Sequence, residues 1–241
     1  MAHADDASTN FQELLKNAKT VPRFSPCLEP EDSPFSLDVG IRFYEQMLTE
    51  SLLGSTQREA QSLAPIWQQE ENAILICLPS FQPEWTLSVV GDRSSRYWVL
   101  LAEAQSSLWL STTSWYSTAG NPFPVPPSVK IYRSEMAADL GGEVCEIWRR
   151  VLSQTRYPQE HCDGCDGVIY HFTYSRRGTK GIPRRSGKTW SPEEDSVPGK
   201  LVGLSHTLAD YAKDPVNRDV FLEVIQDRVR WFQERSQQFS N

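Results

Sequence analysis

Closely spaced β-rich segments in the middle of the chain constrain its fold more than any other feature. Runs of valine, isoleucine, leucine and aromatic residues alternate with turn pairs such as Pro79-Ser80 and Gly91-Asp92. A parallel strand pair needs a crossover of about a dozen residues or more, and these gaps are shorter. The spacing therefore predicts an antiparallel meander, with strands at residues 74–78, 86–90, 97–104, 108–113, 129–134 and 168–174.

Helical periodicity marks the segments that follow the meander. The clearest helix covers residues 141–157, where apolar side chains recur from Val144 at the spacing of one buried stripe. A second helix is predicted at residues 199–213. The last helix is expected to begin with Asp214 as its cap and Pro215 at its first position, and to run to residue 237. It should bury Phe221, Val224, Ile225 and Phe232.

The N-terminal third is predicted to be helical, with helices at residues 11–19, 37–53 and 56–71, the last broken by Pro65. Four prolines make residues 20–36 an extended connector. We expect a helical N-terminal segment over residues 1–72 and an α+β domain over residues 73–241, or one continuous domain. The predicted class is α+β, with an antiparallel meander sheet and helices packed mainly on one face.

Six cations follow the strand at 168–174, with no acid between Gly167 and Pro192, although the whole chain has a net charge of −7. Three interpretations stay open: a solvated hairpin, a docking element for an acidic protein, or a phosphate or nucleic-acid contact. A P-loop is rejected because Gly187-Lys188-Thr189 lacks the leading glycine of that motif. The partner-binding candidates are Arg176, Arg177, Lys180, Arg184, Arg185, Lys188, His171 and Trp190.

His171 has two possible roles. It alternates with Tyr170 and Phe172, so it lies on the strand face opposite the expected core face. It is either a packed or surface histidine or the base of an enzyme. No serine or cysteine has the partner spacing of a recognisable nucleophile. His206 falls opposite the apolar stripe of its helix and is expected to be solvated.

Cys162 and Cys165 form the one Cys-x-x-Cys motif of the chain. Zinc needs about four ligands, and a second pair is missing. Thioredoxin-like pairs follow a strand and open a helix, whereas this pair precedes a strand. A metal site, a redox pair and two plain thiols all stay open, and we expect no resident cofactor.

The odd number of cysteines, five, favours reduced thiols in the cytoplasm. Export stays an alternative because Ala2-His3-Ala4 resembles the end of a cleaved leader.

Other polar and aromatic groups give weaker signals. Glu84, Glu103 and Glu135 lie in or beside predicted strands, where charges protect sheet edges from aggregation or can converge for acid–base chemistry. Some aromatic residues of the sheet region, which includes Trp98 and Trp109, are expected to be partly exposed, as at protein interfaces, although packing within the sheet is the favoured interpretation. An acidic chain does not suit nucleic acid. No apolar run reaches the roughly 18 residues of a membrane span.

The C-terminal part contains an aspartate-glycine strand at residues 166–172, the Thr189-Trp190-Ser191-Pro192 turn and a leucine-rich helix at residues 201–204. This pattern resembles a group of uncharacterised bacterial proteins. Residues 147–152 and 155–157 fit the same pattern. The resemblance covers about 100 residues and implies no known activity.

The sequence favours a function in protein binding without catalysis. Some small acidic bacterial proteins of mixed α/β build are immunity proteins that neutralise secreted toxins, and this chain is similar in composition. An acidic surface can engage a basic toxin, and exposed aromatic residues can anchor the contact. The alternative is a hydrolase or a nucleotide- or phosphate-handling enzyme centred on His171 and the arginine-rich segment.

Overall fold

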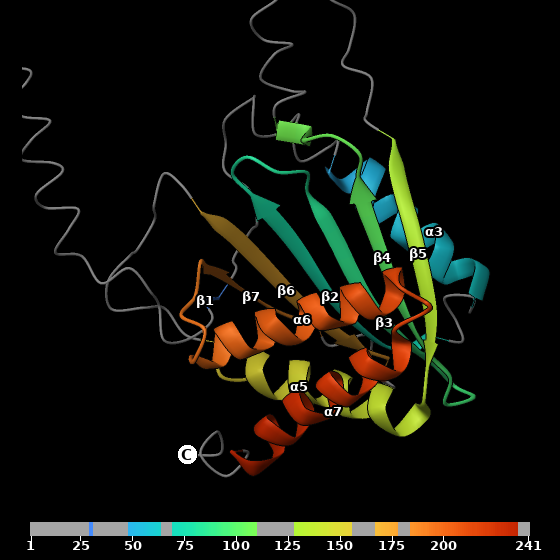
Figure 1. The fold of residues 1–241 in the computed structure, drawn as a ribbon, viewed down its shortest axis with the longest axis vertical. Helices are drawn as coiled ribbons and strands as arrows, with labels where there is room; N and C mark the ends of the chain where they lie inside the picture. The colour runs from blue at the N-terminus through green and yellow to red at the C-terminus, as the bar shows by residue number, and fades with distance from the viewer. Residues whose placement is uncertain are drawn as a thin grey trace, which may run out of the picture.

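The computed structural model describes residues 29–30, 48–63, 69–109, 128–155, 167–177 and 184–235. These residues form an antiparallel sheet with three long helices on one face and a shorter helical segment on the other (Figure 1). The predicted α+β class is therefore confirmed. The helix expected at 11–19 and nearly all of the connector at 20–36 lie outside the described residues.

The strands are ordered β1-β7-β6-β2-β3-β4-β5, and all neighbours pair antiparallel. The register aligns Phe172, Leu75, Leu87 and Leu101 in one apolar row across four strands. This row forms because alternate residues of each strand point to the same face. The strands are β1 (Glu29–Pro30), β2 (Gln69–Pro79), β3 (Trp85–Asp92), β4 (Tyr97–Ala104), β5 (Val129–Met136), β6 (Val168–Arg176) and β7 (Arg184–Trp190).

Three expectations about the strands are wrong. β2 begins at Gln69, so the end of the helix predicted at 56–71 is part of the sheet. Leu108 and Trp109 are helical and do not begin a strand. The second half of the cationic segment is β7, which pairs with β6, so it is not a loop. In the first and third cases pairing with a neighbouring strand overrides weak local propensity.

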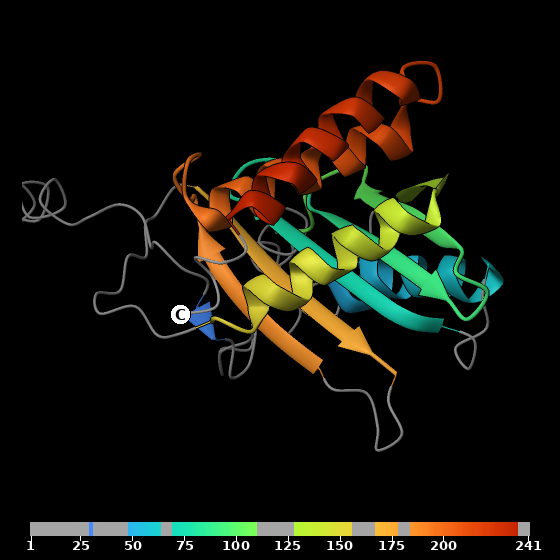
Figure 2. The same cartoon turned by 90° about the horizontal axis from the view of Figure 1, so that it is seen from below.

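Helices α5 (Ala138–Leu152), α6 (Val197–Lys213) and α7 (Arg218–Glu234) cover one face of the sheet (Figures 1 and 2). Trp148 of α5 is fully buried and meets Phe172 edge-on, with 5.9 Å between ring centroids. α6 adds the buried side chains of Leu201, Leu204 and Leu208 to the same core. The predicted stripe of α5 is confirmed, and this helix ends at Leu152.

The start of α7 differs from the prediction. The Asp214 carboxylate accepts hydrogen bonds from the backbone N–H groups of Val216 and Asn217, at 2.9 and 3.2 Å. Asp214 therefore organises the turn between α6 and α7, and α7 begins only at Arg218. Val224 is exposed, so its expected burial is wrong, and Phe221 is only partly buried. The side chains buried by α7 are those of Ile225, Val229 and Phe232.

The opposite face of the sheet is covered by η1 (Leu48–Leu53), a π-helix, and by α3 (Gly54–Leu63). Leu48 and Leu52 pack against Ala102 and Ala104 of β4. The hydroxyl groups of Thr56 and Thr86 form a buried hydrogen bond of 2.9 Å between α3 and β3. Residues 48–53 confirm the end of the helix predicted at 37–53, and residues 37–47 lie outside the described part.

Gly199 in the first turn of α6 offers a test of this packing. A Cβ atom there would lie 1.9 Å from the backbone oxygen of Glu193, which cannot move without moving the turn before the helix. We expect Gly199→Ala to lower the free energy of unfolding by about 2 kcal/mol. Gly142 of α5 is the control, because a Cβ there meets the Tyr97 hydroxyl at an ordinary 3.5 Å. Gly142→Ala should be neutral or stabilising by up to about 1 kcal/mol. Equal losses for the two variants in urea unfolding would contradict this explanation.

Candidate functional site

The cations after β6 do not gather into one site. Directly opposed residues of an antiparallel pair share a face of the sheet. Lys188 is opposite His171, so both lie on the face away from α5. Trp190, opposite Ile169, lies on that same face. The sequence correctly placed His171 on the face opposite the core, and its side chain is buried there.

The other candidates lie on or near the helical face or outside the described part. Arg185 is opposite Tyr174, on the helical face, and is exposed. Arg177 follows β6, and its backbone N–H donates to the backbone oxygen of Glu70 at 2.8 Å. Arg184 begins β7. Lys180, Cys162 and Cys165 lie outside the described residues, so the zinc and redox interpretations stay predictions. Within the described ranges, no three His, Cys, Asp or Glu side chains are grouped to hold a metal ion.

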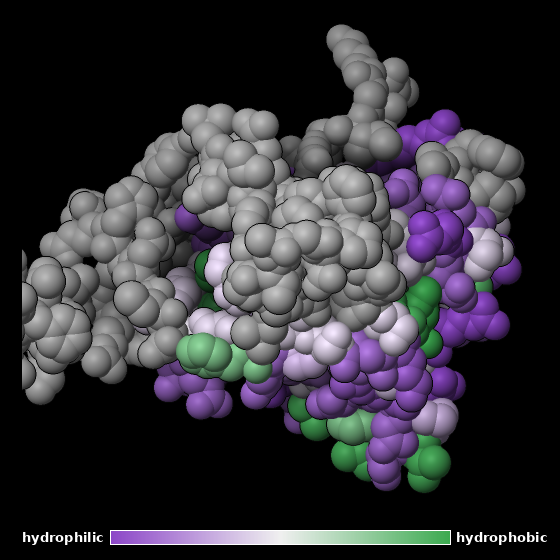
Figure 3. Space-filling model, turned by 90° about the horizontal axis from the view of Figure 1, so that it is seen from above, coloured by the Kyte–Doolittle hydropathy of each residue, from purple (hydrophilic) through white to green (hydrophobic). Residues whose placement is uncertain are grey.

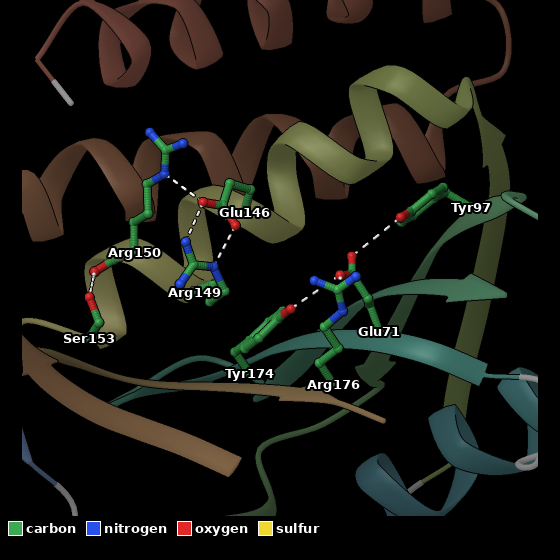
Figure 4. A network of polar contacts seen from close by, with 8 residues as sticks. All are labelled: Glu71, Tyr97, Glu146, Arg149, Arg150, Ser153, Tyr174 and Arg176. Carbon is green, nitrogen blue, oxygen red and sulfur yellow. Dashed lines mark hydrogen bonds and ion pairs between the residues drawn. The ribbon is translucent and has the colours of Figure 1, made fainter. Parts of the chain in front are cut away.

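The sheet and α5 instead enclose a polar cluster around Glu71 of β2 (Figure 4). Its carboxylate accepts hydrogen bonds from the hydroxyl groups of Tyr97 and Tyr174, each at 3.3 Å. Arg176 of β6, directly opposite Glu71, forms an ion pair with it at 3.2 Å. Only 13% of the Glu71 side chain is exposed. Two strands, β4 and β6, thus supply donors to one nearly buried carboxylate on β2.

Burial and a neighbouring negative charge act on the two tyrosines of this cluster. Burial, followed by the negative charge of Glu71, raises the pKa values of Tyr97 and Tyr174 well above their usual value. The two phenols therefore stay protonated at neutral pH and donate to the carboxylate. A carboxylate bound by two phenols and a guanidinium is strongly held, which suits a fixed structural role better than proton transfer.

A second group of charges on α5 is centred on Glu146. It accepts from Arg149 and from Arg150, at 2.5 and 2.6 Å. The hydrogen bond from Arg149, followed by that from Arg150, lowers the pKa of Glu146 to about 2, against the opposing effect of burial. Figure 4 shows Glu146 between the two guanidinium groups. The three side chains together carry one net positive charge.

The lowered pKa of Glu146 predicts a pH dependence of stability. A carboxylate whose pKa is lowered by folding contributes stability above its unfolded pKa, and this contribution is lost as the pH falls through the folded pKa. The window therefore runs from the ordinary 4.5 down to about 2. Because 35% of the side chain is exposed, we expect Glu146→Gln to cost only about 1 kcal/mol at pH 7. Thermal unfolding at pH 7 and at pH 2 should show the wild type and the variant converging in acid. A constant difference would contradict the assignment.

A groove of about 530 Å³ lies between α5 and α7. Its floor is apolar and is formed by Ile147 and Val151 of α5 and by Val229 and Phe232 of α7. Ala138 and Gly142 also line the groove, and their small size leaves space on its α5 side. Pockets of about 300–1,000 Å³ with apolar walls and a few polar groups are typical ligand and partner sites.

Acids dominate the rim of this groove. Asp139, Glu143 and Glu146 of α5 line it together with Arg150 and Gln233. Glu146 is neutralised by its arginines, whereas Asp139 and Glu143 form no ion pair with any residue that the structure describes. Glu143 accepts a hydrogen bond of 2.9 Å from the Gln233 side-chain amide, which bridges the two helices. The groove therefore offers an apolar floor beside two uncompensated negative charges.

The acids singled out from the sequence have structural contacts. Glu84 is fully buried and accepts from the backbone N–H groups of Leu108 and Trp109, at 2.7 and 3.0 Å. The interpretation of Glu84 as an exposed edge charge is therefore wrong. Glu103 forms an ion pair with Lys213, and the backbone oxygen of Glu135 accepts from Tyr211. These contacts do not bring the three carboxylates together.

The aromatic residues of the sheet divide between its two faces. Trp98 is buried under α3, in agreement with packing within the sheet, whereas Trp109 is 41% exposed, in agreement with partial exposure of some aromatic residues. His206 of α6 is exposed, as predicted, and its Nε2 lies 3.4 Å from the Tyr170 hydroxyl. Its ring also meets Trp85 edge-on, and the partial loss of water lowers the pKa of His206.

Comparisons with known proteins give no relative for this chain. No family model, no curated protein and no solved structure matches it. Among the described residues, no helix has the length and apolar character to cross a membrane. The resemblance to uncharacterised bacterial proteins stays a prediction.

Proposed function

We propose that this chain is a protein-binding module that does its work without catalysing a reaction. The observation that carries the proposal is the α5–α7 groove, with its apolar floor and the uncompensated charges of Asp139 and Glu143 on the rim. The occupant is a positively charged segment of a protein partner. Its apolar side chains contact Val229 and Phe232, and its lysine or arginine side chains meet the rim acids.

The proposal extends to the biological role of an immunity protein that binds and neutralises a toxin. The net charge of −7 supports a basic partner such as a nuclease toxin. Residence in the cytoplasm fits this role, and it agrees with the free thiols of Cys77 and Cys145 in the core.

The alternative enzyme was centred on His171 and the cationic segment. Two observations favour binding over that alternative. The candidates lie on two different faces of the sheet, so they do not surround one reacting group. The groove between α5 and α7 lies elsewhere, and its lining holds neither His171 nor a residue of β6 or β7.

Affinity capture from cells of the source organism tests the proposal. Gln233→Trp places a large side chain at the groove, and Gln57→Trp places the same side chain on the exposed side of α3 as a matched control. We expect the wild type and Gln57→Trp to recover the same basic protein, and Gln233→Trp to recover at least about tenfold less. The recovered protein should stop growth when expressed alone and be harmless when expressed together with the wild type.

Two results would overturn the proposal. One is equal recovery by Gln233→Trp and Gln57→Trp, which removes the groove from binding. The other is turnover of a phosphate ester or another hydrolysable substrate by the purified protein, abolished in His171→Ala, which establishes the enzyme instead.

A further inference from the structure

The outward side of α7 carries a second surface, separate from the groove. Val216, in the turn before the helix, is 87% exposed, Val220 is 58% exposed and Val224 is 38% exposed. Val220 and Val224 lie about one helical turn apart and form an apolar row along α7, with Val216 just before the start of the helix. Apolar side chains scattered singly over a surface need no explanation, whereas a continuous exposed row marks an interaction site.

A row of acids runs beside the valines. Asp219, Glu223 and Asp227 also recur every fourth residue, and all three are exposed. Asp219 and Glu223 each precede a valine of the first row, so the two rows are neighbours on the helix surface. Asp227 forms an exposed ion pair with Arg230 at 2.9 Å, and the other two acids form no ion pair with a described residue.

The remaining arginines of α7 do not neutralise the acidic row. The Arg228 guanidinium lies over α6, where it approaches the position that a Cβ of Gly203 would take. The Arg218 guanidinium lies 5.8 Å from the centre of the Tyr211 ring. Both charges are thus directed toward α6 and Tyr211. The outward face of α7 keeps an apolar row and an acidic row side by side.

The position of α7 leaves this face accessible. The connected ends of α6 and α7 project away from the sheet (Figure 2). Apolar surface interrupts the polar surface at that projecting end (Figure 3). A partner helix can therefore approach α7 from outside without displacing any helix that packs on the sheet.

We propose that the outward face of α7 docks an amphipathic basic helix of a partner protein, with its apolar row on the valines and its lysine or arginine row on the acids. Charge complementarity selects this partner, because a basic row spaced by four residues matches Asp219, Glu223 and Asp227. This inference goes beyond the proposed function, since it assigns a second surface that does not use the groove.

A synthetic helical peptide tests the inference directly. The probe has a leucine row and a lysine row, each with a spacing of four residues, and a second probe has glutamate in place of lysine. Fluorescence anisotropy should show salt-sensitive binding of the basic probe to the full chain and about tenfold weaker binding of the acidic probe. Val220→Ser with Val224→Ser should weaken the basic probe about tenfold.

Charge reversal gives the sharper comparison. Replacing Asp219, Glu223 and Asp227 by lysine should abolish the preference for the basic probe and increase binding of the acidic one. The matched control replaces Glu193, Glu194 and Asp195 by lysine, which changes the net charge equally at exposed positions before α6. This control should keep the preference for the basic probe.

Three outcomes would overturn the inference. They are equal effects of the two triple replacements, no binding of the basic probe by the wild type, and loss of binding in Gln233→Trp alone. The last outcome places the peptide in the α5–α7 groove, so it rejects the α7 surface while it supports the proposed function. Loss of partner capture in Gln233→Trp does not alter the binding of the peptide to α7. The two proposals can therefore be tested separately.

Discussion

Replacing Trp148 by alanine is expected to lower the free energy of unfolding by about 4 kcal/mol. Trp148 is 0% exposed, and it fills the space between α5 and the sheet, where it meets Phe172 edge-on. Removal of the indole leaves a cavity that surrounding side chains cannot fill, because α5 is also held by Val144 and Leu152 in the same core. Guanidinium unfolding followed by circular dichroism measures the loss.

Trp148→Phe is the matched control for this change. The ring of phenylalanine restores most of the volume, and the buried Nε1 of Trp148 has no hydrogen-bond partner to lose. We therefore expect a cost of about 1 kcal/mol for Trp148→Phe. A loss below about 1 kcal/mol for Trp148→Ala would show that α5 does not pack on the sheet as described.

Glu84→Ala is expected to cost about 3 kcal/mol, the second largest effect. The buried carboxylate of Glu84 accepts from the backbone N–H groups of Leu108 and Trp109, which begin a helical segment. Truncation removes this acceptor from both donors. Ser107, whose hydroxyl lies 3.5 Å from the same carboxylate, loses a contact as well.

Two controls separate this role from a general effect of charge. Glu84→Gln keeps one acceptor oxygen and should lose about half as much stability as Glu84→Ala. Glu193→Ala removes an exposed acid and should change stability by less than about 0.5 kcal/mol. Equal melting temperatures for Glu84→Ala and Glu193→Ala would reject the structural role of Glu84.

The strands of the meander could be predicted because their local pattern and their pairing agree. β4 was expected at residues 97–104 and occupies those residues, since a run of apolar residues between turns leaves few other solutions. β7 could not be predicted in the same way. Residues 184–188 have the composition of a solvated loop, with two arginines, a serine, a glycine and a lysine. They form a strand because β6 supplies a ladder of hydrogen-bonding partners.

The position of Glu71 shows a second limit of sequence analysis. Residues 69–72 contain Gln, two Glu and Asn, which suit the end of a helix better than a strand. They extend β2 because β3 pairs on one side and β6 on the other. The tyrosines that bind Glu71 come from β4 and β6, so only the sheet order brings the cluster together.

The groove depends on tertiary packing in the same way. The apolar stripe of α5 was evident from the sequence, but the space beside Ile147 exists only because α7 lies against that flank. Nothing in the local sequence fixes how two helices far apart in the chain pack. The one local signal was the pair of small residues, Ala138 and Gly142, on the side of α5 that borders the groove.

The proposed binding function rests on contact between a partner and the α5–α7 groove. Hydrogen exchange of the full chain, free and in complex with the partner that it captures, tests this contact most directly. We predict slower exchange on binding for amides of α5 and α7 at the groove, with unchanged exchange in α3. Slower exchange confined to β6 and β7 or to α3, with α5 and α7 unaffected, would contradict it.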